Sequence, residues 1–145
     1  MILRVAAICA AVLWSLPVEA QLPSLSNPVI TLTAQAAGTV NSVAETNLSG
    51  GAVTCVLNQS SHTGSPSSTL SIQAQDPGGS GLFYNLITSA AIVADATPTA
   101  VSAGKGVQTT ANVSASLPVP TRWRAQVVVG GTTPAVTGTV GCVVN

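Results

Sequence analysis

The sequence predicts an all-β protein: a single β-sandwich, immunoglobulin-like or jelly-roll-like, built from about 7–9 short strands. Hydrophobic residues make up 46% of the 145 residues and aromatic residues only 3%, so the apolar content is mainly Ala, Val, Leu and Ile. This mixture, together with many Thr and Ser residues, favours strands. Turn signals recur roughly every 8–12 residues, and no segment keeps the 3.6-residue period of an amphipathic helix.

The first predicted strands alternate apolar and polar residues, as a half-buried strand does. Residues 29–34 (VITLTA) give the first strand, and residues 35–50 are small and polar and predict a loop with at most one short extended piece. Residues 52–58 form the next strand. Residues 60–67 contain glycine and proline, so we predict a turn there.

Residues 69–88 predict a β-hairpin. The first arm, residues 69–75, alternates cleanly between apolar and polar side chains. The sequence DPGGSG at residues 76–81 predicts a tight connection, because Asp, Pro and Gly all favour turns. Residues 82–88 (LFYNLIT) then return as the second arm.

The C-terminal part of the chain carries the remaining elements. Residues 90–94 fit either a helical turn or a strand, and LPVP at residues 117–120 predicts a stiff extended link. GGTTP at residues 130–134 predicts a turn. The predicted strands of this region are residues 97–102, 107–114, 122–129 and 135–144.

Residues 1–20 have the layout of a secretory signal peptide. Arg4 supplies a positive charge, and an apolar stretch of about a dozen residues follows until Pro17 interrupts it. Small residues precede the expected cleavage site between Ala20 and Gln21. The alternative is an N-terminal membrane anchor, but the apolar stretch is too short to span a bilayer comfortably. We therefore expect cleavage and a secreted or periplasmic protein.

Cleavage would leave a mature chain with an extended leader and first strand (residues 21–50) and a β-sandwich body (residues 51–145). No later segment has the roughly 18 consecutive apolar residues of a spanning helix, so we expect no membrane insertion after cleavage. The whole chain has four basic and four acidic residues and a formal net charge of zero. This balance argues against nucleic acid as a partner, because phosphate binding needs a clustered basic face.

Two cysteines remain after signal cleavage, Cys55 and Cys142, and an even number in an oxidising compartment predicts a disulfide. Each lies in an apolar run that alternates like a strand, VTCVL and VGCVV. Both thiols would then point towards the core, as an inter-strand or inter-sheet bridge requires. The alternative is two buried free thiols. A metal site is not expected, since the single histidine and the scattered carboxylates form no ligand cluster.

The groups that could carry chemistry are few and scattered. His62 lies in a Ser-, Thr- and Gly-rich segment with no matching Asp or Cys motif, and no Gly-x-Ser-x-Gly motif is present. Asp76 is explained by its place in a turn. The sequence also lacks a phosphate-binding loop and a dinucleotide fingerprint. We therefore expect no enzyme activity and no cofactor.

Three aromatic residues remain in the mature chain, Phe83, Tyr84 and Trp123. Neighbouring residues on a strand face opposite ways, so one of Phe83 and Tyr84 should be in the core and the other exposed. Trp123 lies between Arg122 and Arg124 and is expected to be a large core residue. The alternative is that Trp123, with Tyr84, forms a surface contact for a sugar or a partner protein.

Residues 51–144 resemble a group of small β-rich virion-structural or uncharacterised proteins of tailed bacteriophages and prophages. The resemblance lies in an ordered series of short pieces, of which QxxDP at residues 73–77 and RWR at residues 122–124 are the most specific. It implies a β-sandwich that works by assembly or surface attachment. Members of that group generally lack a secretion signal and paired cysteines. The other pieces are GAVTCVLNQ at 51–59, TGSP at 63–66, YNLI at 84–87, ANV at 111–113, LPVPT at 117–121 and GGTTP at 130–134.

Together these features predict a non-enzymatic, exported structural or surface-binding protein whose partner is a protein, either a copy of itself or a larger assembly. One alternative is a subunit of a secreted fibre or pilus, in which VITLTA at residues 29–34 would be exchanged with a neighbour. The two cysteines are, however, farther apart than we would expect in a pilin. A carbohydrate-binding module is a further alternative, and the scarcity of aromatic residues disfavours it.

Overall fold

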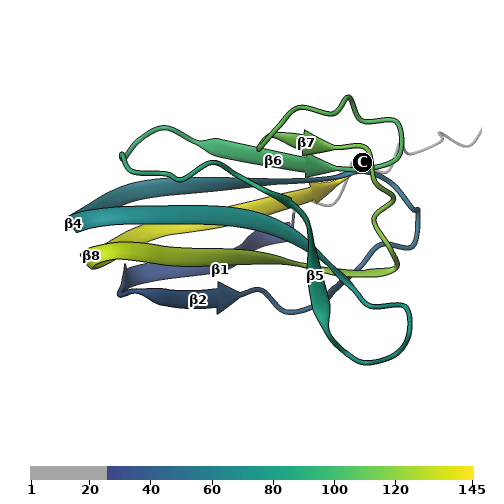
Figure 1. The fold of residues 1–145 in the computed structure, drawn as a ribbon, viewed down its shortest axis with the longest axis horizontal. Coiled ribbons are helices and arrows are strands. Elements are labelled where there is room, and N and C mark those ends of the chain that lie inside the picture. Colours follow the sequence, from purple (N-terminus) through teal and green to yellow (C-terminus); the bar gives the residue numbers. More distant parts are fainter. Residues whose placement is uncertain (1–25) are drawn as a thin grey trace, which may run out of the picture.

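The computed structural model describes residues 26–145 (Figure 1). The predicted signal peptide and its cleavage between Ala20 and Gln21 lie outside the described residues. The described part contains eight strands and no helix, so the predicted all-β class is confirmed. The strands are β1 (Ser26–Gln35), β2 (Gly38–Asn41), β3 (Glu45–Thr46), β4 (Val53–Gln75), β5 (Phe83–Thr88), β6 (Thr99–Ala103), β7 (Ser114–Ala115) and β8 (Arg122–Val144).

Two long antiparallel strands, β4 and β8, form the centre of the fold. Each has 23 residues, and they pair along almost their whole length, from Val53 opposite Val144 to Ala74 opposite Trp123. Figure 1 shows them running side by side across the molecule. The prediction of short strands is therefore wrong for these two, which each join two predicted strands into one.

The predicted turns at residues 60–67 and 130–134 are the reason for this difference. Both segments lie inside the long strands and face each other, with Pro66 opposite Gly131. The pairing shifts once between Gln59 and Ser61 and once between Thr63 and Ser65. Each shift marks a β-bulge, which adds a residue and bends a strand without ending it. The glycines and prolines of these segments lie where the paired strands β4 and β8, called the ribbon below, bend together. The sequence pattern had instead indicated that strands end there.

The bulges also change which side chains are buried. In β4 the buried positions are odd-numbered from Val53 to Gln59 and include the even-numbered Leu70, Ile72 and Ala74 beyond the bend. The same change of alternation occurs along β8. One extra residue in each strand therefore keeps apolar side chains on the core side of both halves of the ribbon.

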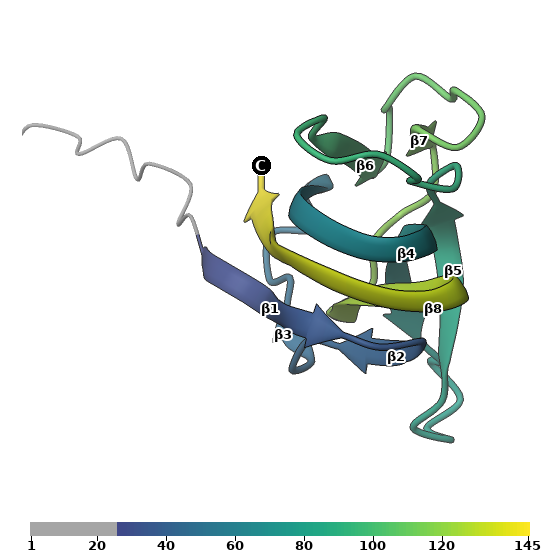
Figure 2. The same ribbon diagram turned by 90° about the vertical axis from the view of Figure 1, so that its left-hand side faces the viewer.

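Shorter strands extend the ribbon differently at its two ends. At one end β1 pairs with β8, β6 pairs with β4, and β7 lies parallel to β6. At the other end β2 and β3 pair with β8, and β5 pairs with β4. All eight strands thus belong to a single hydrogen-bonded sheet, along which β4 and β8 curve (Figure 2). The finer expectation of an immunoglobulin-like or jelly-roll-like sandwich stays a prediction.

One hydrophobic cluster draws side chains from both ends of the sheet. Leu57 and Val140 come from one end, and Ile72 and Trp123 come from the other. Strand β1, the predicted strand VITLTA, adds Ile30 and Leu32 to the same cluster. Strand β1 therefore belongs to the same sheet, and its Ile30 and Leu32 to the same core, as the rest of the described residues.

The remaining predictions divide between confirmed and wrong. The hairpin over residues 69–88 is present as the second half of β4 paired with β5. The predicted strand at residues 97–102 is β6. The predicted strand at residues 107–114 is wrong, because only Ser114 of this segment belongs to a strand, β7. Residues 90–94 form neither a helix nor a strand, and their one bridge joins Ile92 to Ser68.

Candidate functional site

A disulfide between Cys55 and Cys142 joins the two central strands. The two residues are directly opposite each other in the β4–β8 pairing, and their Cα atoms lie 4.1 Å apart. The neighbouring backbone bond from Asn145 N–H to the Ala52 carbonyl places the hydrogen-bonded pairs at even positions of β4. Cys55 and Cys142 therefore form a non-hydrogen-bonded pair, in which side chains approach most closely. The predicted pairing of the two cysteines is present.

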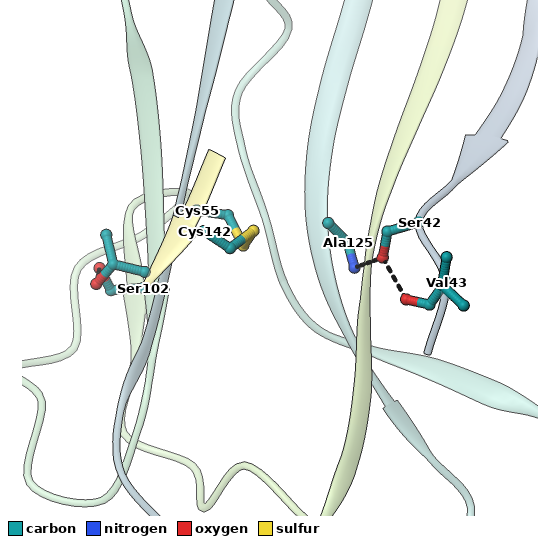
Figure 3. The surroundings of a disulfide bond; sticks show 7 residues. Ser42, Val43, Cys55, Ser102, Ala125 and Cys142 are labelled. Atoms are coloured by element: carbon teal, nitrogen blue, oxygen red, sulfur yellow. Dashed lines mark hydrogen bonds between the residues drawn. A yellow bond between two sulfur atoms is a disulfide. The ribbon is translucent and has the colours of Figure 1, made fainter. Parts of the chain in front are cut away.

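The disulfide lies in the core at one end of the ribbon (Figure 3). Cys55 is 0% exposed and Cys142 is 4% exposed, so the bond is closed to solvent. It connects residues 87 positions apart and so closes a loop that includes β4 to β8. Such a bond fits an oxidising, extracytoplasmic environment.

Ser42 connects the segment between β2 and β3 to β8 by hydrogen bonds, at the end of the β4–β8 pair away from the disulfide. Its hydroxyl accepts a hydrogen bond from the Ala125 backbone N–H at 3.0 Å and donates one to the Val43 carbonyl at 2.7 Å. Figure 3 shows these two bonds well apart from the disulfide. In this gap between β2 and β3, the Ser42 hydroxyl thus accepts the hydrogen bond that a backbone carbonyl would accept in a continuous strand.

A second group, His62 with Asp95 and Gln59, joins β4 to the connection between β5 and β6. His62 Nδ1 donates to Asp95 Oδ1 at 2.7 Å, and Gln59 Nε2 donates to the same oxygen at 3.1 Å. The Ala96 backbone N–H donates to the Gln59 carbonyl. The sequence analysis found no partner for His62, because Asp95 lies 33 residues away and no motif links the two positions.

The hydrogen bond from His62 lowers the pKa of the Asp95 carboxyl below its ordinary value, and the bond from Gln59 adds to this effect. A His–Asp pair acts in nucleophilic catalysis when a nucleophile lies within hydrogen-bond reach of the histidine. Within residues 26–145 His62 has no such hydrogen bond to a hydroxyl or thiol. The hydrogen bonds of Asp95 therefore connect β4 to the segment between β5 and β6, and their strength depends on the negative charge of Asp95.

A third group lies on the outer face of the sheet, where β8, β4 and β5 meet. The Arg124 Nε atom donates to Gln73 Oε1 at 2.7 Å, and Gln73 Nε2 donates to Asn85 Oδ1 at 2.8 Å. The guanidinium carbon of Arg124 lies 4.1 Å from the centre of the Phe83 ring, a cation–π contact. The cross-strand register explains this row, since Gln73 is opposite both Arg124 and Asn85.

Of the two proposed surface aromatics, Trp123 is in the core and Tyr84 is at the surface. Trp123 is 1% exposed, so the expectation that it is a core residue is confirmed, and the alternative of a surface contact at this residue is wrong. Its Nε1 atom has no hydrogen-bond partner in the described part of the chain, so the indole fills the core at the cost of one unpaired buried N–H. Tyr84 is 49% exposed and remains available to a partner. Phe83 faces the opposite side from Tyr84 and is partly covered by Arg124, so the prediction that one of these two aromatic residues lies in the core is wrong.

Asp76 lies in the turn between β4 and β5. Asp76 organises the hairpin turn, accepting hydrogen bonds from the Gly78 N–H at 3.0 Å and the Ser80 hydroxyl at 2.6 Å. The bond from Ser80 is the main reason that the pKa of Asp76 is lowered. Within residues 26–145 no three His, Cys, Asp or Glu side chains gather as metal ligands.

Comparison of the chain with protein-family models, curated proteins and solved structures finds no match in any of the three. The described residues also include no helix of the length and hydropathy needed to cross a membrane. The sequence resemblance to phage structural proteins therefore stays a prediction.

Proposed function

We propose that the protein is an exported, non-enzymatic structural or surface-binding protein, similar in kind to small structural proteins of tailed phages. The observation that carries the proposal is the buried disulfide between Cys55 and Cys142, which joins the two long central strands of the sheet, β4 and β8. Disulfides form and persist in oxidising compartments. The predicted signal peptide leads to the same compartment, and secreted or periplasmic release is part of the proposal.

The surface of the described residues supports a binding or structural role. Of its six charged side chains, Asp95 is tied to His62 and Asp76 to its own turn. A weakly charged surface lowers the repulsion between copies of a protein, which favours assembly. The partner in this proposal is a protein, either another copy of the chain or a larger assembly.

Quantitative mass spectrometry of the producing cells tests the proposal. Cytoplasm, periplasm, medium and gradient-purified particles are compared, and the same spectra report the first residue and the state of Cys55 and Cys142. We expect the chain to begin at Gln21 and to be oxidised, in the periplasm or the medium. An uncleaved, reduced chain in phage-like particles would show a virion component and refute export.

A fibre or pilus subunit is the second candidate, and one observation favours it. Strand β1 pairs only with β8, so its other edge is open, and it has no charged residue to discourage a further strand. Its side chains Ile30 and Leu32 are buried in the core of their own chain. In a fibre, β1 of a neighbouring copy would take this place.

Deleting residues 21–34 tests the fibre candidate, which is wrong if assembly persists unchanged. Because the deletion also removes Ile30 and Leu32 from the core, the shortened protein is measured with and without an added peptide of residues 26–35. If the fibre candidate is correct, the peptide restores the thermal stability of the shortened protein. Stability that does not respond to the peptide would argue against exchange of this strand.

A further inference from the structure

Two arginines on the outer face of the sheet have no acidic partner. Arg122 and Arg124 are two residues apart on β8, so their side chains leave the same face roughly 7 Å apart. Among the described residues no carboxylate lies within ion-pair distance of either arginine, and the one carboxylate contact of this kind joins Asp95 to the His62 ring. The only other cation of the described chain, Lys105, lies on the connection between β6 and β7. Two of the three Lys and Arg side chains of the described residues are therefore adjacent on β8 and form no ion pair there.

Arg124 is held in place by groups that do not neutralise it. Gln73, which is only 6% exposed, accepts the hydrogen bond from Arg124 Nε, and the Phe83 ring lies under the guanidinium. These contacts fix the plane of the guanidinium, and its two terminal nitrogens have no hydrogen-bond partner among residues 26–145. A guanidinium held in this way loses little conformational freedom when it binds a carboxylate in the bidentate geometry.

Neutral hydrogen-bonding side chains continue the face on both sides of Arg124. Gln126, the next residue of β8 on this face, donates to Asn41 Oδ1 at 2.9 Å. Asn85 completes the row on the other side. Beyond Arg122 the face ends in an open pocket of about 330 Å³, where Pro77 and Pro120 add apolar surface. Asp76 also lines this pocket, with each carboxylate oxygen already accepting a hydrogen bond from its own turn.

We propose that this face, defined by Arg122, Arg124, Gln126, Asn41 and Asn85, binds an acidic polysaccharide. The carboxylates of uronic-acid units would pair with the two arginines, and the sugar hydroxyls would exchange hydrogen bonds with the amides. A protein partner would need an apolar centre to its interface. Of the exposed large apolar side chains, Val43, Leu48 and Val93 lie on connecting loops, and Val128 lies on this face of β8, two residues beyond Gln126 at the end away from Arg122. The inference goes beyond the proposed function and holds for the folded protein in any compartment.

Titration calorimetry with tetragalacturonate tests the proposal, with its fully methyl-esterified form as the matched neutral control. We expect the acid to bind and the ester to bind at least about tenfold more weakly, because esterification removes only the charges. R122Q and R124Q should each weaken binding about tenfold, the effect of losing one charge-assisted hydrogen bond. K105Q removes one positive charge elsewhere and should leave the affinity unchanged.

Folding is controlled within the same set of variants. Arg122 is exposed and its side chain makes no hydrogen bond or ion pair within residues 26–145, so R122Q should keep the melting temperature of the original protein. Absence of binding to the acid, or an equal loss in K105Q, would overturn the proposal. Tetraglutamate that bound as tightly as the sugar acid would also overturn it, since the face would then select acidic peptides.

Discussion

Removing the disulfide should cost a large part of the stability of this protein. The variant replaces both Cys55 and Cys142 with alanine, so that no buried thiol is left unpaired. The bond joins residues 87 positions apart. In the chain-entropy model, closing a loop of that length removes about 15 cal/mol/K from the unfolded chain, or about 4.6 kcal/mol at 25 °C. Total stabilities of domains are about 5–15 kcal/mol, so the variant should be marginal.

Denaturant unfolding of the oxidised protein and the double alanine variant measures this difference. A second comparison uses the original protein reduced in denaturant and refolded, because its buried disulfide is closed to reductant in the folded state. Reduction changes only the cross-link, whereas the alanine variant also removes two sulfur atoms from the core. We expect both forms to lose about 4–5 kcal/mol and the melting temperature to fall by roughly 15 °C. A loss below about 1 kcal/mol in the reduced protein would refute the argument.

Three further outcomes follow from the structure. Trp123→Ala should cost about 3–5 kcal/mol in urea unfolding, since the indole fills the core; a cost under about 1 kcal/mol would contradict this placement. Gly131→Ala should lower the melting temperature far more than Gly79→Ala. Both glycines have positive φ, but only at Gly131 would a Cβ overlap a β4 carbonyl. Equal melting temperatures of the two variants would argue against the bend. The lowered pKa of Asp95 predicts stability that is present above its unfolded pKa of about 3.9 and is lost as the pH falls through the folded value. Asp95→Asn should reduce this acid dependence of the melting temperature, and an unchanged profile would show that the tie to His62 contributes nothing.

The hairpin and the disulfide were predictable because their signals are local or few. Alternation in residues 69–75 and the DPGGSG turn occupy neighbouring positions, so the return of the chain as β5 follows from short-range geometry. The pairing of Cys55 with Cys142 follows from counting, since two cysteines remain after signal cleavage. Likewise, Trp123 in a strongly alternating strand was expected to lie in the core.

The two groups around charged side chains were not predictable. Asp95 reaches His62 only because the connection between β5 and β6 crosses beside the bend of β4. The row from Arg124 through Gln73 to Asn85 depends on the pairing of three strands from distant parts of the sequence. The sequence places Arg124 on one strand face, but it does not say which side chains from other strands share that face.

The sequence by itself determined the all-β class, the faces of the strands and the cysteine pair, because alternation and composition act on neighbouring residues. The tertiary structure alone decided that residues 60–67 and 130–134 continue their strands. Glycine and proline favour turns and bulges alike, and the outcome depends on whether a second strand bends at the same place. Here Pro66 faces Gly131 across the pairing, and each strand carries one extra residue, so the ribbon bends as a unit and keeps its apolar side chains on the core side.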